Sequence, residues 1–216
     1  MARLQNDVAL PPPENPAVRS RSDVRQEQLI EIAIRLFARK GYEGTSLRDI
    51  ADEAKITKAA LYYHFPNKEA LYGRIVLESM QALVDSVRDA MARASSPSEK
   101  VRIFMLTSAD FLDRSRDSWI ASSNAFWAGS DSEPRSAAVS LRDEYEHLLR
   151  DAITEAIDKG QFRAVDAAMA GRMLLSMVNH ISRWHSTKGR LSTRQVVDGY
   201  LDMAFKGLAK PSKASK

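Results

Sequence analysis

The segment TSLRDIADEAKITKAALYYHFPNK runs from Thr45 to Lys68 and contains two short helical patterns separated by a tight turn. Ser46 suits the N-cap of the first pattern, and Asp49, three residues later, is its acidic partner. Apolar residues then recur at helical spacing, namely Leu47, Ile50, Ala51 and Ala54. We therefore predict a short helix that begins just after Ser46.

The second pattern follows directly. Lys55 and Ile56 form the turn, Thr57 is the N-cap, and the helix is expected over Lys58 to Phe65. Pro66 ends it, because the residue before a proline is disfavoured in the α region. Two helices with this short connection predict a helix-turn-helix, whose second helix enters the major groove of DNA.

The chemistry of the second helix agrees with that prediction. No acidic residue occurs between Ala54 and Lys68, and short polar and aromatic side chains alternate with lysines. Such groups suit phosphate oxygens and base edges. The expected DNA contacts are Thr45, Ser46, Arg48, Thr57, Lys58, Ala59, Ala60, Tyr62, Tyr63, His64 and Lys68. The alternative is an ordinary helical hairpin with a solvated basic face.

Two runs of sequence, GYEGTSLRDIA from Gly41 and LYYHFPNKE from Leu61, resemble the DNA-binding domain of TetR-family transcriptional regulators. The resemblance extends from about Arg25 to Leu71. It departs from the family pattern at Lys55, where glycine is usual, and at Ala59, where glycine is frequent. The resemblance implies an all-α fold of about nine helices, a homodimer and a small-molecule effector.

Composition is consistent with a helical regulator. The 216 residues are 44% hydrophobic and 28% charged, the formal net charge is +4, and there is no cysteine. The absence of cysteine excludes disulfides and thiolate chemistry. No segment is expected to span a membrane, and no signal peptide is visible, so a cytoplasmic protein is expected.

We find no pattern that indicates catalysis, a metal site or a cofactor. His180 and His185 are five residues apart and therefore lie on different helix faces, unlike the i,i+4 histidines of a helical zinc site. A DNA-binding architectural or regulatory protein without an effector is the main alternative. The long C-terminal part argues against it, since dimerisation alone needs far fewer residues.

The chain divides into an extension (1–22), a DNA-binding domain (23–70), an effector-binding and dimerisation domain (71–210) and a tail (211–216). The extension carries Arg19 and Arg21, and is expected either to touch DNA or to be only a soluble tail. Besides the two short helices, helical patterns are expected over Asp23–Lys40, Lys68–Ala94, Ser98–Arg116, Ser132–Lys159, Val165–Ser186 and Ser192–Leu208, with an aromatic segment over Trp119–Trp127.

Methionine and aromatic residues are concentrated in the C-terminal domain. A stripe of this kind is usually core, but the TetR resemblance implies an effector cavity between these helices. The expected ligand contacts are Phe104, Met105, Phe111, Trp119, Asn124, Trp127, Met173, Met177, His180, Arg183 and Trp184, with Phe126 and Asn179 nearby. Arg183 is expected to bind an anionic group or to form a structural ion pair.

A shorter resemblance narrows the effector class. The segments ISRW from Ile181, GRLS from Gly189 and QVVDGYL from Gln195 are similar to TetR-type regulators that sense fatty acids or acyl-CoA thioesters. The broader TetR-family resemblance implies that the last two helices form the dimer interface, with a second row made of Val197, Tyr200, Leu201, Ala204, Phe205 and Leu208. The expected protein is a dimeric repressor that binds a palindromic operator on double-stranded DNA and is released by such an effector.

Overall fold

The computed structural model describes residues 21–123 and 133–208, and these residues form α-helices with no β-strand among them. The predicted all-α fold is confirmed. In order, the helices are α1 (Arg21–Lys40), α2 (Leu47–Glu53), α3 (Lys58–His64), α4 (Lys68–Met91), α5 (Pro97–Arg114), α6 (Arg116–Ser123), α7 (Glu133–Asp158), α8 (Ala167–Trp184) and α9 (Thr193–Leu208). Nearly all of the predicted extension and the whole predicted tail lie outside the described residues, as do Asn124, Phe126 and Trp127.

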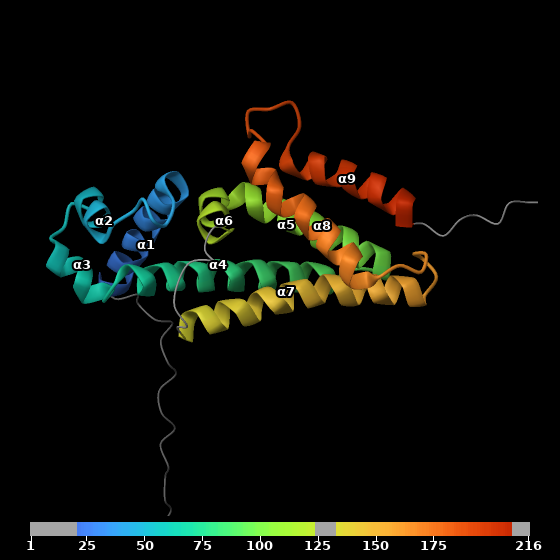
Figure 1. The fold of residues 1–216 in the computed structure, drawn as a ribbon, viewed down its shortest axis with the longest axis horizontal. Helices are drawn as coiled ribbons and strands as arrows, with labels where there is room; N and C mark the ends of the chain where they lie inside the picture. The colour runs from blue at the N-terminus through green and yellow to red at the C-terminus, as the bar shows by residue number, and fades with distance from the viewer. Residues whose placement is uncertain (1–20, 124–132, 209–216) are drawn as a thin grey trace, which may run out of the picture.

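The three N-terminal helices form one end of the molecule, and α4 leaves them to run along the rest of the fold (Figure 1). α7 lies beside α4, and α5 packs on both of them. α8 packs on α7 and α5, and α9 packs on α5 and α8. α6 packs against both α1 and α4. The second half of the molecule therefore reaches the first through two elements, α4 and α6.

Side-chain caps set where several helices begin. The side chains of Ser46, Thr57, Asn67, Ser96 and Asp166 each accept a hydrogen bond from a backbone N–H three residues later, at the starts of α2, α3, α4, α5 and α8. A cap of this type stabilises a helix by about 1 kcal/mol. Local chemistry thus explains why the predicted starts lie within a few residues of the observed ones.

The helix ends also follow from local sequence. Gly41 and Gly160 follow α1 and α7 with φ values of 74° and 68°, a left-handed conformation that glycine adopts without steric cost. Phe65 was predicted to be helical, but it lies just outside α3 with φ of −136°. Pro66 accounts for this correction, because its ring disfavours helical geometry at the preceding residue.

The interior is continuous from the N-terminal helices into the C-terminal ones. Its largest fully buried side chains include Phe37, Phe104, Leu29, Ile50, Leu61, Leu71, Ile75, Met105, Leu112, Leu149, Ile153 and Leu174. Burial of one such side chain stabilises the fold by about 1.5–3 kcal/mol. Along the described chain, every helix falls short of the length and hydropathy needed to cross a bilayer.

Candidate functional site

The turn between α2 and α3 fixes the direction in which α3 projects. Its tightest point is Lys55, whose φ of 54° is left-handed, and the Ile56 N–H donates back to the Ala51 carbonyl at 3.0 Å. On the inner side of α3, Leu61 is fully buried. α3 is therefore anchored through one face and projects the other.

The outer face of α3 is exposed and free of acidic residues. Lys58, Ala59, Ala60 and Tyr62 are exposed, and Tyr63 has 83% of its surface accessible. The Lys58 ammonium lies over the Tyr62 ring, 5.4 Å from its centroid. α3 also lies at the outer end of the molecule (Figure 1). This face offers a cation, small residues and aromatic hydroxyls to an external surface.

Four predicted DNA contacts lie beside this face. Ser46 and Thr57 are exposed caps, Arg48 is exposed, and His64 is partly buried with its ring 5.3 Å from that of Tyr63. The Arg48 side chain lies 3.8 Å from the Asp52 carboxylate, a contact exposed on both sides. Each of these residues remains available at the surface of the helix-turn-helix.

Thr45 requires a correction. It is only 1% exposed, and its hydroxyl lies 2.9 Å from the Gly41 carbonyl and 3.3 Å from that of Leu36. The hydroxyl holds the connection between α1 and α2, so Thr45 positions the helix-turn-helix from inside and is removed from the expected DNA contacts.

Lys68 makes intramolecular contacts that the sequence did not reveal. Its ammonium donates to the Tyr42 carbonyl at 3.0 Å and lies 4.0 Å from the centroid of the Tyr42 ring. Tyr42 in turn packs on Tyr72 of α4 and on Phe37 of α1, with ring centroids 4.6 and 5.9 Å away. These contacts tie the start of α4 to the helices that carry α3.

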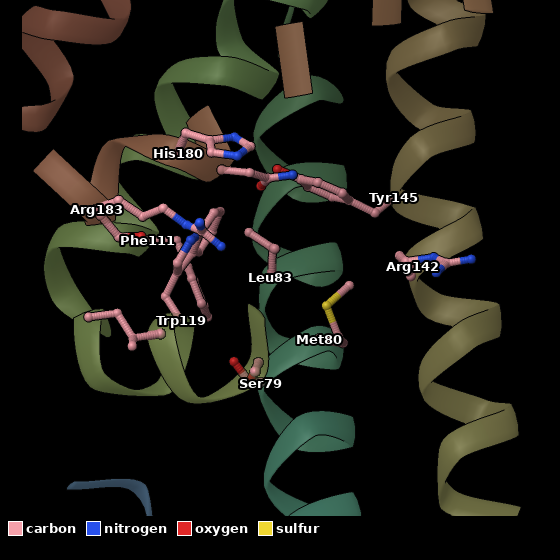
Figure 2. A pocket seen from close by; sticks show the side chains of 13 residues that line it. Ser79, Met80, Leu83, Phe111, Trp119, Arg142, Tyr145, His180 and Arg183 are labelled. Atoms are coloured by element: carbon pink, nitrogen blue, oxygen red, sulfur yellow. The ribbon is translucent and has the colours of Figure 1, made fainter. Parts of the chain in front are cut away.

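A cavity of about 570 Å³ lies in the C-terminal half, where α4, α5, α6, α7 and α8 face one another (Figure 2). Its walls combine apolar and polar side chains from all five helices. The lining residues are Ser79, Met80, Leu83, Phe111, Trp119, Ile120, Ser122, Arg142, Tyr145, Asn179, His180, Ser182 and Arg183.

Four of the eleven predicted ligand contacts line this cavity: Phe111, Trp119, His180 and Arg183. Two others, Asn124 and Trp127, lie outside the described residues. Asn179, expected from the sequence to lie nearby, also lines the cavity. The α7 residues Tyr145 and Arg142 were missed, because nothing in the sequence of that helix distinguishes a cavity-facing residue from a core-facing one.

The remaining five predicted ligand contacts lie elsewhere. Phe104 and Met105 are fully buried in the core, and the Phe104 ring packs 4.5 Å from that of Tyr145. Met173 and Trp184 are 40% and 55% exposed on the outer side of α8, and Met177 is partly buried without lining the cavity. We correct the predicted contact set accordingly.

The cavity is cationic. Arg142 and Arg183 line it, and its described lining contains no acidic residue. Arg142 is bound to the neighbouring Asp143 at 2.9 Å and points away from the apolar wall, whereas Arg183 extends from α8 toward Phe111 and Trp119 (Figure 2). Arg183 is therefore the better placed of the two for an anionic ligand.

The hydrogen bonds of Tyr145 have a defined direction. Ser108 donates its only hydroxyl hydrogen to the Phe104 carbonyl at 2.8 Å, so Tyr145 must donate to the Ser108 oxygen at 2.6 Å. Burial raises the pKa of the Tyr145 hydroxyl well above its ordinary value. The neutral phenol thus presents only acceptor capacity to any further group.

α6 connects the cavity with the N-terminal helices. Trp119, Ile120 and Ser122 line the cavity, and the adjacent Ala121 carbonyl accepts a 2.6 Å hydrogen bond from the Tyr72 hydroxyl of α4. Tyr72 also packs on Phe37 of α1, with ring centroids 5.0 Å apart. A displacement of α6 would therefore act directly on the helices that support α3.

Known protein families match both the N-terminal and the C-terminal part of the chain. The family model described as "Bacterial regulatory proteins, tetR family" matches residues 29–75. The model described as "Tetracyclin repressor-like, C-terminal domain" matches residues 94–208. The HTH-type transcriptional repressor KstR2 of Rhodococcus jostii is 27% identical over 202 residues, covering 93% of this chain and 98% of the repressor.

Two solved structures are similar over most of their length. PfmR, a TetR family transcriptional regulator from Thermus thermophilus, is 34% identical with a TM-score of 0.77, covering 85% of this chain and 100% of PfmR. AibR, solved in complex with isovaleryl coenzyme A and operator DNA, is 31% identical with a TM-score of 0.77, covering 84% of this chain and 98% of AibR.

Proposed function

This chain belongs to the TetR family of bacterial transcriptional regulators, and we propose that it is a dimeric repressor released from a palindromic operator by a small apolar acid or its acyl-CoA thioester. The observation that carries the proposal is the exposed, acid-free face of α3, anchored from behind by Leu61. A recognition helix needs this combination of a fixed backbone and an accessible cationic face.

The proposed dimer uses α8 and α9. Large apolar side chains are exposed there, namely Met169, Met173 and Trp184 on α8 and Met203 on α9. Two recognition helices must reach successive major grooves about 34 Å apart, which a symmetric pair achieves. Phe205, expected in the interface, packs 5.1 Å from the Phe162 ring of its own chain, so Met203→Glu is the better variant for disrupting the dimer.

The proposed effector occupies the cavity, with an apolar body against Phe111 and Trp119 and an anionic group near Arg183. The cationic lining supports an acid, and the isovaleryl coenzyme A bound by the similar AibR supports the thioester form. A ligand shifts an equilibrium only if it binds one conformation better than the other. We propose that the ligand-bound arrangement displaces α6 and, through Tyr72, the N-terminal helices.

DNA binding is the first test. Wild-type protein is titrated with a fragment of its own upstream region at several salt concentrations. We expect affinity to fall steeply with salt, and the slope to become shallower by about 0.9 for each phosphate contact removed. Lys58→Ala should weaken binding, whereas Lys188→Ala, which removes an equal charge in the connection between α8 and α9, should not. Salt-insensitive or absent binding by the wild type would refute the proposal.

The effector class is tested separately. Hexanoic, dodecanoic and hexadecanoic acids and their coenzyme A thioesters are screened by thermal shift, and the strongest binder is added to the protein–DNA complex. Release of DNA is expected, together with weakened binding in Arg183→Gln. Binding of DNA without any response to this panel would leave a regulator with a different effector, or with none.

A further inference from the structure

One buried side-chain oxygen beside the cavity has no hydrogen-bond partner among the described residues. Ser122 is 6% exposed and lines the cavity, and its buried hydroxyl oxygen makes no hydrogen bond to any described residue. Leaving a buried hydroxyl unpaired costs about 1–3 kcal/mol, and buried polar groups are rarely left in this state. A ligand group in the cavity removes that cost if the Ser122 side chain turns about χ1 to bond to it.

Tyr145 is a polar residue of the same cavity whose hydrogen-bonding capacity is defined. The hydroxyl hydrogen of Tyr145 is committed to Ser108, so the Tyr145 oxygen can only accept further hydrogen bonds. The Ser122 hydroxyl can both donate and accept. Met80, Leu83, Phe111 and Ile120 contribute the aliphatic and aromatic hydrocarbon of the same cavity. A purely aliphatic ligand would pack against these apolar side chains but would leave the Ser122 hydroxyl without a hydrogen bond.

We propose that the cavity selects an oxygenated ligand, one that carries a hydroxyl or carbonyl group on its apolar body and places that oxygen at Ser122. This inference rests on the proposed function, because it specifies the class of effector for the same cavity. A hydroxyl is the best match, since it accepts from Ser122 and still has a hydrogen to donate. A carbonyl accepts from Ser122 alone.

Selection at Ser122 also acts at the right place for a switch. Ser122 follows Ala121, the residue whose carbonyl accepts the hydrogen bond from Tyr72. A ligand bound to Ser122 therefore contacts α6 next to the point where α6 meets α4. An oxygenated ligand is expected to release DNA more effectively than a hydrocarbon analogue at equal occupancy of the cavity.

The test uses matched ligands and the full-length protein. Binding of dodecanoic acid is compared with binding of dodecanoic acids hydroxylated at successive chain positions, by calorimetry. At the best position we expect the hydroxyl to strengthen binding to wild type by about 3- to 10-fold. Ser122→Ala should reduce this ratio of affinities, hydroxylated to unsubstituted acid, to near one. Ser79 is a partly exposed serine on the α4 side of the cavity, and Ser79→Ala should preserve the ratio.

Two further measurements keep the inference separate from the proposed effector class. Cyclohexanol and methylcyclohexane report on Ser122 without a carboxylate. A preference for cyclohexanol that Ser122→Ala abolishes supports the inference even if no acid binds, and then only the anionic effector is wrong. Equal binding of both neutral ligands, or a preference that survives Ser122→Ala, overturns it. Because its oxygen is unpaired, Ser122→Ala should unfold at no lower temperature than wild type, and clear destabilisation would also overturn it.

Discussion

At the scale of single residues, Lys55 is strained. Its φ of 54° is the one positive value at a non-glycine residue in the described parts of the chain. A residue with a Cβ pays roughly 1–2 kcal/mol for left-handed geometry. The fold tolerates this because the turn is fixed on both sides by the caps and buried faces of α2 and α3.

Replacing Lys55 by glycine should relieve the strain. Part of the gain is lost, because glycine makes the unfolded chain more flexible by roughly 0.4–1 kcal/mol. We expect Lys55→Gly to be more stable than Lys55→Ala by a few tenths to about 1 kcal/mol in urea unfolding. The alanine variant is the control, since it removes the same charge and keeps the strain. Equal stability of the two variants would contradict the assignment of strain.

Asp49 provides a pH-dependent contribution to stability. Its carboxylate accepts hydrogen bonds from the Ser46 hydroxyl, from the Ser46 N–H at 2.8 Å and from Lys40 at 3.2 Å, and these bonds lower its pKa from 3.8 to about 2. A carboxyl whose pKa is lower in the folded protein stabilises the fold fully at pH values above its pKa in the unfolded chain. That contribution is lost as the pH falls through the window between the two values.

Asp49→Asn removes the titrating group and should remove this pH dependence. The difference in unfolding free energy between wild type and variant is expected to be largest above about pH 4 and to shrink as the pH approaches 2. Asp52→Asn is the control, because the Asp52 carboxylate lies in an exposed 3.8 Å ion pair with Arg48 and caps no helix. A difference for Asp49→Asn that stays constant across this window would show that its hydrogen bonds do not stabilise the ionised form.

At the scale of helices, much of the fold was predictable because its signals are local. Ser46, Thr57 and Asn67 cap helices through their own side chains, and Pro66 ends α3 through its own ring. Periodicity then identified which face of each helix is apolar. These features depend on a few neighbouring residues, which the sequence contains in full.

The cavity could not be predicted in the same way. Phe104 and Phe111 lie on one face of α5, two turns apart, yet only Phe111 reaches the cavity. The difference is their position along the helix axis: Phe104 meets Tyr145 of α7, whereas Phe111 lies near Trp119 of α6. Sequence periodicity indicates which face of a helix a residue occupies, but not which other helix packs against that residue. Ser122 was missed for the same reason.

The contact between α4 and α6 gives a prediction about coupling. Tyr72→Phe removes the hydrogen bond to the Ala121 carbonyl and keeps the aromatic packing on Phe37 and Tyr42. We expect the variant to bind both DNA and effector, but the effector should no longer weaken its operator affinity by the wild-type factor. Loss of the hydrogen bond should also lower the free energy of unfolding by about 1–3 kcal/mol.

Tyr42→Phe is the matched control for that variant. Tyr42 belongs to the same aromatic cluster, and its backbone carbonyl, which holds Lys68, is unchanged by the substitution. Operator affinity is measured with and without the strongest binder of the acid and thioester panel. If Tyr72→Phe keeps the wild-type ratio, the coupling runs by another route.

At the scale of the whole molecule, the proposed DNA site and the proposed effector site are linked through α4 and α6. The recognition face of α3 lies at one end, and the cavity lies among the C-terminal helices, with α4 and α6 between them (Figure 1). Coupling between two such sites is typically about 1–3 kcal/mol, which corresponds to about 5- to 150-fold in affinity. We propose that occupancy of either site opposes occupancy of the other.

One thermodynamic cycle measures this coupling between effector binding and DNA binding. The strongest binder of the panel is titrated into the protein with and without saturating operator DNA, and the operator is titrated with and without that ligand. Linkage requires that each weakens the other by the same factor, which we expect to lie between about 5 and 150. Identical ligand dissociation constants with and without operator would contradict the account, leaving a binding cavity that does not control DNA binding.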